Sequence, residues 1–327
     1  MAQRTLIDGI REAMAEEMER DPRVFVLGED VGRKGGVFLA TEGLQERFGP
    51  DRVLDTPLAE AGIVGIAIGA SLNGLIPVAE IQFADFIHPA FDQIVSEATR
   101  MRYRSYGAYS CPITIRVPYG GGVHGGLYHS QSIEAFYAHV PGLKVVAPST
   151  PADAKGLLTS AIRDPDPVMF LEHKKTYRLI KGEIPPGEHL VEFGQAAERR
   201  SGRHATCIAW GLMVHHCLEA AESLAAEGLE IQVLDLRSLR PLPEAQILEA
   251  VASTSRALIV YEDNLTGGFG AEIAALIAEK AFADLDAPVT RVAAPDLPAM
   301  PFNPAQEAAF LPSPERIAAA LRTLVAY

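Results

Sequence analysis

Glu60 is the carboxyl group whose sequence surroundings most favour chemistry. It lies in DTPLAEAGIVGIAIGAS, where Thr56-Pro57 is typical of a helix start and a long apolar run follows. The helix dipole favours a carboxylate there, but a capping box would place it at Ala59. Because the helix is apolar on every face, we expect it to be buried, and the Glu60 carboxyl to have a raised pKa and a specific partner. Such a group suits proton transfer; a structural carboxylate is the alternative.

A glycine-rich segment, VPYGGGVHGGLYHSQSIEAF at 117–136, is the second candidate. Glycine lets a backbone turn sharply or approach a ligand closely. His129, flanked by Tyr128 and Ser130, is presented from this predicted loop, so we predict a role in proton transfer. His124 is predicted to be a solvated turn residue.

The third candidate is EIQFADFIHPAFDQI at 80–94, where a buried strand is predicted to give way to a helix. Ligand contacts in open α/β sheets are usually made at such places. Gln82 and Phe86 are therefore candidate ligand contacts, whereas Phe83 is predicted to belong to the core.

Several other kinds of site are not expected. TGGFGAEI at 266–273 lacks the glycine spacing of a dinucleotide-binding turn, and His215-His216-Cys217 would point to different sides of a helix rather than to one zinc ion. The 42 acidic residues exceed the 29 basic ones by 13, which argues against binding nucleic acid or an anionic membrane. The three cysteines fit a reducing compartment, the N-terminal segment resembles no targeting signal, and no apolar run is long enough to span a membrane, so the cytoplasm is expected.

The elements that must position these residues alternate between strands and helices, which predicts two α/β domains with mostly parallel sheets. The 327 residues are expected to divide into a first domain at 1–185, a linker at 186–202 and a second domain at 203–327. The predicted strands are 24–27, 77–83, 113–117, 143–147, 168–172, 205–211, 230–235, 257–262 and 288–293. The first predicted helix begins after Thr5 and ends at Asp21-Pro22. The others cover about 58–72, 86–104, 152–163, 213–227, 243–252, 270–283 and 314–325, with a Pro-rich crossover at 295–304.

Together these segments resemble the β subunits of thiamine-diphosphate-dependent 2-oxo acid dehydrogenases. The resemblance runs end to end and includes VLGEDVGRKGGVF (26–38), DTPLAE (55–60), PSTPADAKGLL (148–158) and VLDLRSLRPL (233–242). EIQFADF, LYHSQS, YRLIKGE and PDLPAMP look most like the branched-chain 2-oxo acid (2-oxoisovalerate) enzymes; pyruvate and acetoin enzymes are the alternatives.

The resemblance implies a pyrimidine-binding domain followed by a transketolase C-terminal-like domain. It gives Glu60 the role of hydrogen-bonding a ring nitrogen of the thiamine aminopyrimidine, which favours the imino form of that ring. Phe86 corresponds to an aromatic residue that packs on the pyrimidine, and Leu58 to a backbone contact with it. Gln82 corresponds to a residue of the substrate site, and His129 to the histidine needed when the acyl group passes to lipoamide.

Partners are implied as well. Thiamine enzymes hold the diphosphate through magnesium at a Gly-Asp-Gly motif, which this sequence lacks, so an α subunit is expected to supply it. The family forms heterotetramers of two α and two β chains that dock on a dihydrolipoyl acyltransferase core. Some relatives also hold potassium through backbone oxygens, at positions that correspond to Ile113, Thr114, Ala161, Asp164 and Asp166.

Two readings compete with that of a catalytic β subunit. One is a docking subunit without catalytic residues, against which Glu60 and His129 argue. The other is a single-chain transketolase-like enzyme, against which the missing Gly-Asp-Gly motif argues.

Overall fold

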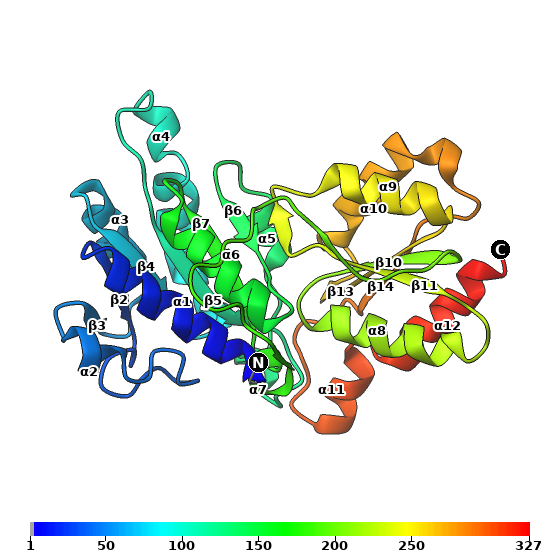
Figure 1. The fold of residues 1–327 in the computed structure, drawn as a ribbon, viewed down its shortest axis with the longest axis horizontal. Coiled ribbons are helices and arrows are strands. Elements are labelled where there is room, and N and C mark those ends of the chain that lie inside the picture. The colour runs from blue at the N-terminus through cyan, green and yellow to red at the C-terminus, as the bar shows by residue number, and fades with distance from the viewer. Residues whose placement is uncertain (1–2) are drawn as a thin grey trace. The chain divides into compact units, whose positions relative to one another are not determined.

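The structure, a computed structural model, describes residues 3–327 (Figure 1). The chain divides into two compact units. The first contains the chain up to Tyr119 together with Phe136–Phe193, and the second contains Gly120–Ala135 together with Gly194–Tyr327. The glycine-rich segment that carries His129 thus belongs to the second unit, although the sequence places it inside the predicted first domain.

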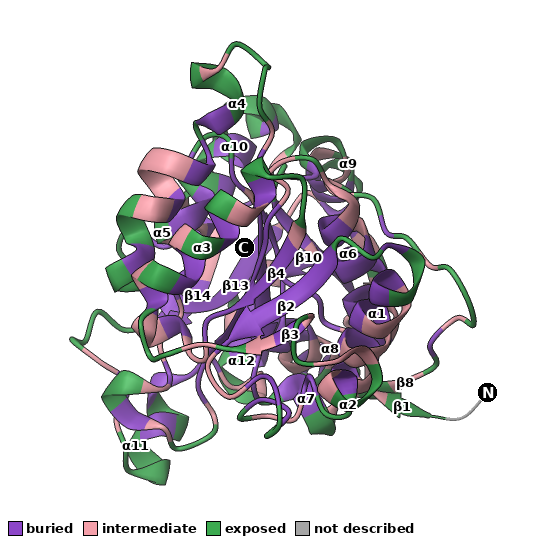
Figure 2. Cartoon of the chain, turned by 90° about the vertical axis from the view of Figure 1, so that its left-hand side faces the viewer, coloured by how far each residue is buried: buried purple, intermediate pink, exposed green. Residues whose placement is uncertain are grey.

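The first unit is built on a parallel sheet whose strands lie in the order β6-β7-β5-β4-β2-β3. Most of its strand residues are buried, as expected for a sheet covered on both faces. Helices α1 and α6 pack against each other on one side, and α3 packs against β4 (Figure 2). The bounds of these strands are β2 Val24–Gly28, β3 Val53–Asp55, β4 Ile76–Glu80, β5 Thr114–Tyr119, β6 Lys144–Val146 and β7 Val168–His173. The helices are α1 Leu6–Arg20, α2 Leu44–Phe48, α3 Glu60–Leu72, α4 Met101–Arg104, α6 Pro151–Arg163 and α7 Thr176–Leu179, and two short strands, β1 Arg4–Thr5 and β8 Lys181–Gly182, pair with each other. Helix α5, Glu134–Ala138, begins in the second unit and ends in the first.

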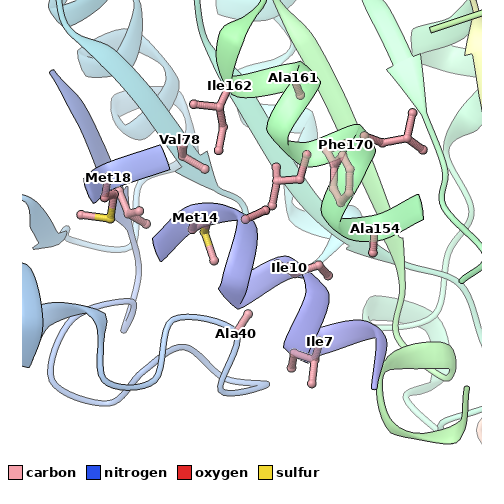
Figure 3. Packing of buried hydrophobic residues seen from close by; sticks show 14 of the residues in the cluster. Ile7, Ile10, Met14, Met18, Ala40, Val78, Ala154, Ala161, Ile162 and Phe170 are labelled. Atoms are coloured by element: carbon pink, nitrogen blue, oxygen red, sulfur yellow. The ribbon is translucent and has the colours of Figure 1, made fainter. Parts of the chain in front are cut away.

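Helix α1 anchors the core of this unit (Figure 3). It begins with a capping box, in which Thr5 accepts from the Asp8 N–H and Asp8 accepts from the Thr5 N–H. Its apolar face, which includes Ile10 and Met14, is fully buried in a cluster with residues of α6 and the sheet. Burial of each such side chain contributes about 1.5–3 kcal/mol.

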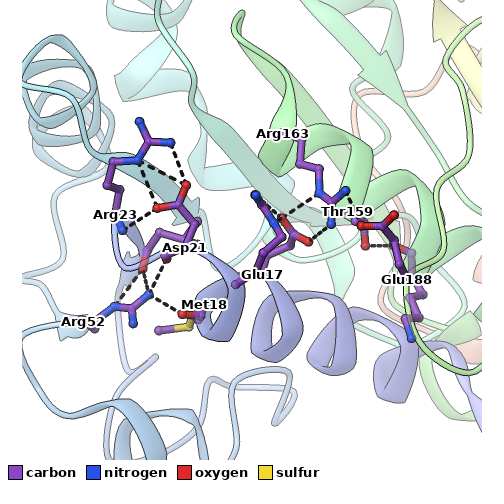
Figure 4. Close-up of polar contacts among 11 residues, drawn as sticks. Glu17, Met18, Asp21, Arg23, Arg52, Thr159, Arg163 and Glu188 are labelled. Atoms are coloured by element: carbon purple, nitrogen blue, oxygen red, sulfur yellow. Dashed lines mark hydrogen bonds and ion pairs between the residues drawn. The ribbon is translucent and has the colours of Figure 1, made fainter.

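Charged pairs border this core (Figure 4). The buried Glu17 carboxylate on α1 accepts hydrogen bonds from Arg163 of α6 at 2.7 and 3.0 Å, and so ties the two helices together. Asp21, just after α1, pairs with Arg23, and this contact lowers the pKa of Asp21 to about 2.

Helix α3 is buried on one side only, which corrects the prediction of burial on every face. Ile63, Val64, Ala67 and Ile68 are buried. The opposite side, formed by Gly62, Gly65, Ile66 and Gly69, is largely open, and Ile66 is 56% exposed. A helix whose residues are apolar on every face, such as α3, is therefore not necessarily buried on every face within this unit.

The single helix predicted at 86–104 is also wrong. The segment consists of two 3-10 turns, Ala84–Phe86 and His88–Ala90, a π-helical stretch at Gln93–Ala98, and the short α4. Pro89 lacks an N–H and disfavours a regular helix around it, and the π-helical stretch changes the helical period again.

The second unit has a sheet in the order β14-β13-β10-β11-β9. Four of these strands are parallel, and β9 joins the edge antiparallel to β11. Part of the segment predicted as a linker is therefore a strand, and an unpredicted helix, α11, follows the Pro-rich crossover. The bounds are β9 Ala197–Arg200, β10 Ala205–Ala209, β11 Ile231–Asp235, β12 Ser238–Arg240, β13 Ala257–Asn264, β14 Thr290–Ala294, α8 Leu212–Ala225, α9 Glu244–Thr254, α10 Gly270–Lys280, α11 Pro304–Phe310 and α12 Pro314–Val325.

None of the helices among residues 3–327 combines the length and the apolar character that a membrane span requires.

Candidate functional site

The carboxyl edge of the first sheet brings two of the three predicted site segments, those of Glu60 and Gln82, to one place. Gly28 at the end of β2 lies opposite both Asp55 of β3 and Glu80 of β4, so the three strands end together. The loops that follow carry Glu29, residues 56–59 just before Glu60, and Gln82. Ligands of open α/β sheets bind at this edge, as the sequence predicted for Gln82.

Glu60 is the first residue of α3 and is buried, with 8% of its surface exposed. Among residues 3–327, no hydrogen bond of its carboxyl is formed. Its negative charge acts on Glu29, whose pKa is raised by burial and by the charges of Asp30 and Glu60. Residues 3–327 thus keep two carboxyl groups close together at the sheet edge and give the Glu60 carboxyl no hydrogen bond, which leaves it available to a ligand.

The neighbouring candidates differ in exposure. Leu58, in the turn before α3, is 72% exposed, and Gln82 is half-buried in the turn after β4. Phe86 is half-buried, and its ring meets Phe83 edge to face at 5.7 Å between centroids. Phe83 in turn contacts Phe38 at 5.4 Å, so it connects Phe86 to the interior instead of being fully enclosed.

Sequence reasoning missed a buried charge network behind this edge. The Arg116 guanidinium on β5 donates to both Glu172 oxygens on β7, at 2.7 and 2.8 Å, and to Glu80 on β4 at 2.5 Å. The Tyr177 hydroxyl donates to Glu172 at 2.5 Å. Burial raises the pKa of Glu80, although Arg116 opposes that effect. The available sequence signal was the presence of opposite charges in apolar strand segments. The network holds the end of β4, the strand that precedes Gln82.

His129 lies in the second unit, half-buried after the 3-10 turn Gly126–Tyr128. Ser130 beside it is fully buried, and its hydroxyl has no hydrogen-bond partner in the described part of the chain. His124 is not simply a solvated turn residue, as predicted: its imidazole is 55% exposed but contacts the Glu307 carboxylate at 2.5 Å.

The five positions suggested for potassium lie in the first unit. Ile113 and Thr114 are at the start of β5, and Ala161, Asp164 and Asp166 are at the end of α6 and in the loop after it. The two carboxylates already form ion pairs, Asp164 with Lys144 at 2.6 Å and Asp166 with Arg102 at 2.7 Å.

Comparisons with known proteins agree with this architecture. The family model for the transketolase pyrimidine-binding domain matches residues 2–180, and the model for the transketolase C-terminal domain matches residues 194–317. The chain is 55% identical over 327 residues to the 2-oxoisovalerate dehydrogenase subunit beta of Bacillus subtilis (strain 168), which covers 100% of both chains. It is 50% identical over 313 residues, 96% of each chain, to the pyruvate dehydrogenase E1 component subunit beta of the same organism.

A solved structure described as a split gene transketolase, inactive beta4 tetramer, aligns with a TM-score of 0.79 and 24% identity over 98% of both chains. At that identity the similarity shows the fold alone. The family models and the full-length relatives go further and confirm the resemblance inferred from the sequence. The chain belongs to the transketolase-like β subunits of the 2-oxo acid dehydrogenases.

Proposed function

We propose that this chain is the β subunit of a branched-chain 2-oxo acid dehydrogenase. The reaction is the oxidative decarboxylation of 2-oxoisovalerate and related 2-oxo acids, with transfer of the acyl group to lipoyl groups of an acyltransferase. The observation that carries the catalytic role is the buried Glu60 carboxyl, which has no hydrogen-bond partner in the described chain. The identity of 55% to the 2-oxoisovalerate relative, against 50% to the pyruvate relative, favours the branched-chain substrate; pyruvate is the alternative.

The residues of the first unit fit the pyrimidine end of thiamine diphosphate. The buried Glu60 carboxyl, which makes no hydrogen bond within the described part of the chain, can hydrogen-bond a ring nitrogen, and the half-buried Phe86 ring can pack on an aromatic ring. Leu58 is exposed and lies between β3 and α3, so its backbone groups can contact the same ring. When bound, thiamine diphosphate supplies the nucleophilic carbon and the electron sink that decarboxylation requires. Gln82 would orient the 2-oxo acid, and His129 would act in acyl transfer.

A second chain is needed for the other end of the cofactor. The sequence has no Gly-Asp-Gly motif, so we assign magnesium and the diphosphate to an α subunit. The open apolar face of α3, with Ile66 exposed between glycines, is suited to contact with another chain. We propose two α and two β chains that dock on a dihydrolipoyl acyltransferase core.

Potassium is a separate proposal. Because Asp164 and Asp166 already have cationic partners, an ion there would depend mainly on carbonyl oxygens. The Ile113 and Ala161 carbonyls each accept one backbone hydrogen bond and keep a second lone pair for a cation.

The test uses the chain reconstituted with its α subunit. Glu60→Ala is expected to lower cofactor-dependent decarboxylation by about 100-fold or more, which is the scale of general acid–base catalysis. Glu46→Ala, an exposed carboxylate on α2, is the matched control and is expected to keep full activity. Unchanged turnover of Glu60→Ala would leave only the docking-subunit interpretation.

Two further measurements separate the alternatives. The ratio of kcat/KM for 2-oxoisovalerate and pyruvate decides between the branched-chain and pyruvate assignments. Calorimetric titration of the isolated chain with thiamine diphosphate and magnesium tests the shared site, since tight binding without the α subunit would contradict it.

A further inference from the structure

The glycine-rich loop of the second unit has an unusual backbone pattern between Gly120 and Gly126. Every second residue has a positive φ, with values of 84° at Gly120, 78° at Gly122, 58° at His124 and 65° at Gly126. Left-handed residues at alternate positions turn successive N–H groups toward one side and form a concave site for an anion. His124 adopts this conformation although it has a side chain, which makes the left-handed region costly, so we expect specific contacts to stabilise it.

The Glu307 carboxylate from α11 is the anion in this concave site. One oxygen accepts from the Gly122 N–H at 2.8 Å and from the His124 N–H at 3.2 Å, and the other lies 2.5 Å from the His124 Nδ1. Glu307 is 1% exposed, so these three contacts replace the hydration of its carboxylate, although the His124 imidazole itself is 55% exposed. The carboxylate thereby holds two residues that are more than 180 positions away in the sequence.

A second carboxylate holds the two ends of the same loop. Glu262 on β13 accepts from the Gly121 N–H at 2.5 Å and from the Ser132 hydroxyl at 3.4 Å. Glu262 supports the loop together with Glu307. Of the two carboxylates, it is Glu307 that contacts both the backbone N–H and the imidazole of His124.

Tight packing connects the Glu307 contacts to His129. A Cβ on Gly125 would lie 2.8 Å from the His129 Cβ, from the His129 carbonyl oxygen and from the Ser130 hydroxyl. A Cβ on Gly126 would lie 2.8 Å from the Phe302 ring. Because Gly125 packs this closely against His129 and Ser130, we expect a shift of the backbone at 122–124 to displace His129 as well.

We propose that Glu307 is a positioning residue: it fixes the loop conformation that presents His129, without contacting substrate or cofactor itself. The proposal rests on the acyl-transfer role proposed for His129. It predicts a specific defect, in which transfer to lipoyl groups is impaired and decarboxylation measured with an artificial electron acceptor is mostly retained.

The test compares Glu307→Ala and Glu307→Gln in the complex reconstituted with the α subunit. Both activities are measured: reductive acylation of a lipoyl domain, and decarboxylation with an artificial acceptor such as ferricyanide. Glu307→Ala is expected to lower reductive acylation by about 10- to 100-fold, because small displacements of a reacting group have effects on that scale. Glu307→Gln keeps an oxygen for the two N–H groups and is expected to restore much of the loss. Gln306→Ala, an exposed position on the same helix, is the control.

His124→Ala removes one of the three contacts of Glu307 and changes only an exposed side chain. It therefore tests the proposal even if the Glu307→Ala variant does not assemble. It should show the same selective defect at a smaller size. The proposal is overturned if these variants lower both activities in parallel, or lower neither. If wild-type complex itself fails to acylate the lipoyl domain, the proposed function is at fault rather than the role of Glu307.

Discussion

Glu134 makes the stability of the second unit depend on pH. It is fully buried at the start of α5, where one oxygen accepts from the Trp210 indole N–H at 2.9 Å and the other has no partner among the described residues. Burial, reinforced by the charge of Asp263, raises the pKa of Glu134 to about 8. Burial likewise raises the pKa of Asp263 to about 6.

The direction of the effect follows from these pKa values. Between the ordinary pKa of 4.5 and about 8, the folded chain keeps a proton on Glu134 that the unfolded chain has released. The free energy of unfolding is therefore highest below pH 4.5 for this group and falls as the pH rises toward 8. At about 1.4 kcal/mol per pH unit, the upper limit is roughly 5 kcal/mol, and we expect about 2–5 kcal/mol because Glu134 and Asp263 share the effect.

The Glu134→Gln variant tests this reasoning, because a neutral amide keeps an oxygen for the Trp210 N–H. It is expected to gain about 2–5 kcal/mol over the wild type at pH 8 and little at pH 4.5. Urea unfolding is measured at several pH values by the fluorescence of Trp210, the single tryptophan, which stacks on Tyr261. Glu222→Gln, an exposed carboxylate on α8, is the control. Equal pH dependence in Glu134→Gln and the wild type would refute the argument.

Three more predictions concern stability and assembly. Arg116→Met leaves the buried Glu80 and Glu172 without their cation, and we expect a loss of about 3–5 kcal/mol in urea unfolding; a loss below 1 kcal/mol would contradict the importance of the network. Thr5→Ala removes the cap of α1 and should cost about 1 kcal/mol, seen as a lower Tm; an unchanged Tm would mean that the cap is dispensable. Ile66→Asp should change the stability of the isolated chain by less than about 0.5 kcal/mol but weaken assembly with the α subunit in size-exclusion chromatography; normal assembly would exclude the open face of α3 as a contact.

Features that depend on neighbouring residues could be predicted from the amino-acid sequence. Apolar runs of strand length alternating with helical periods predicted two α/β units, because each period reflects the repeat of a local element. The same local logic placed Glu60 at a helix start, where the structure has it. It placed Gln82 near the end of a strand predicted at 77–83, whereas β4 ends at Glu80 and Gln82 follows it. Parallel strands end at a common edge, so these two positions could be expected on one sheet.

Which surfaces the elements bury, and which distant residues hold them, depends on tertiary packing. The apolar sequence of α3 does not show which side of the helix packs into the core of its unit and which side stays exposed. Ile66 was therefore predicted to be buried, but it is exposed. The loop that carries His129 is held by Glu262 and Glu307, which lie far away in the sequence and follow no periodic pattern. Contacts of this kind depend on how the chain folds back on itself, and a single sequence carries no local signal for them.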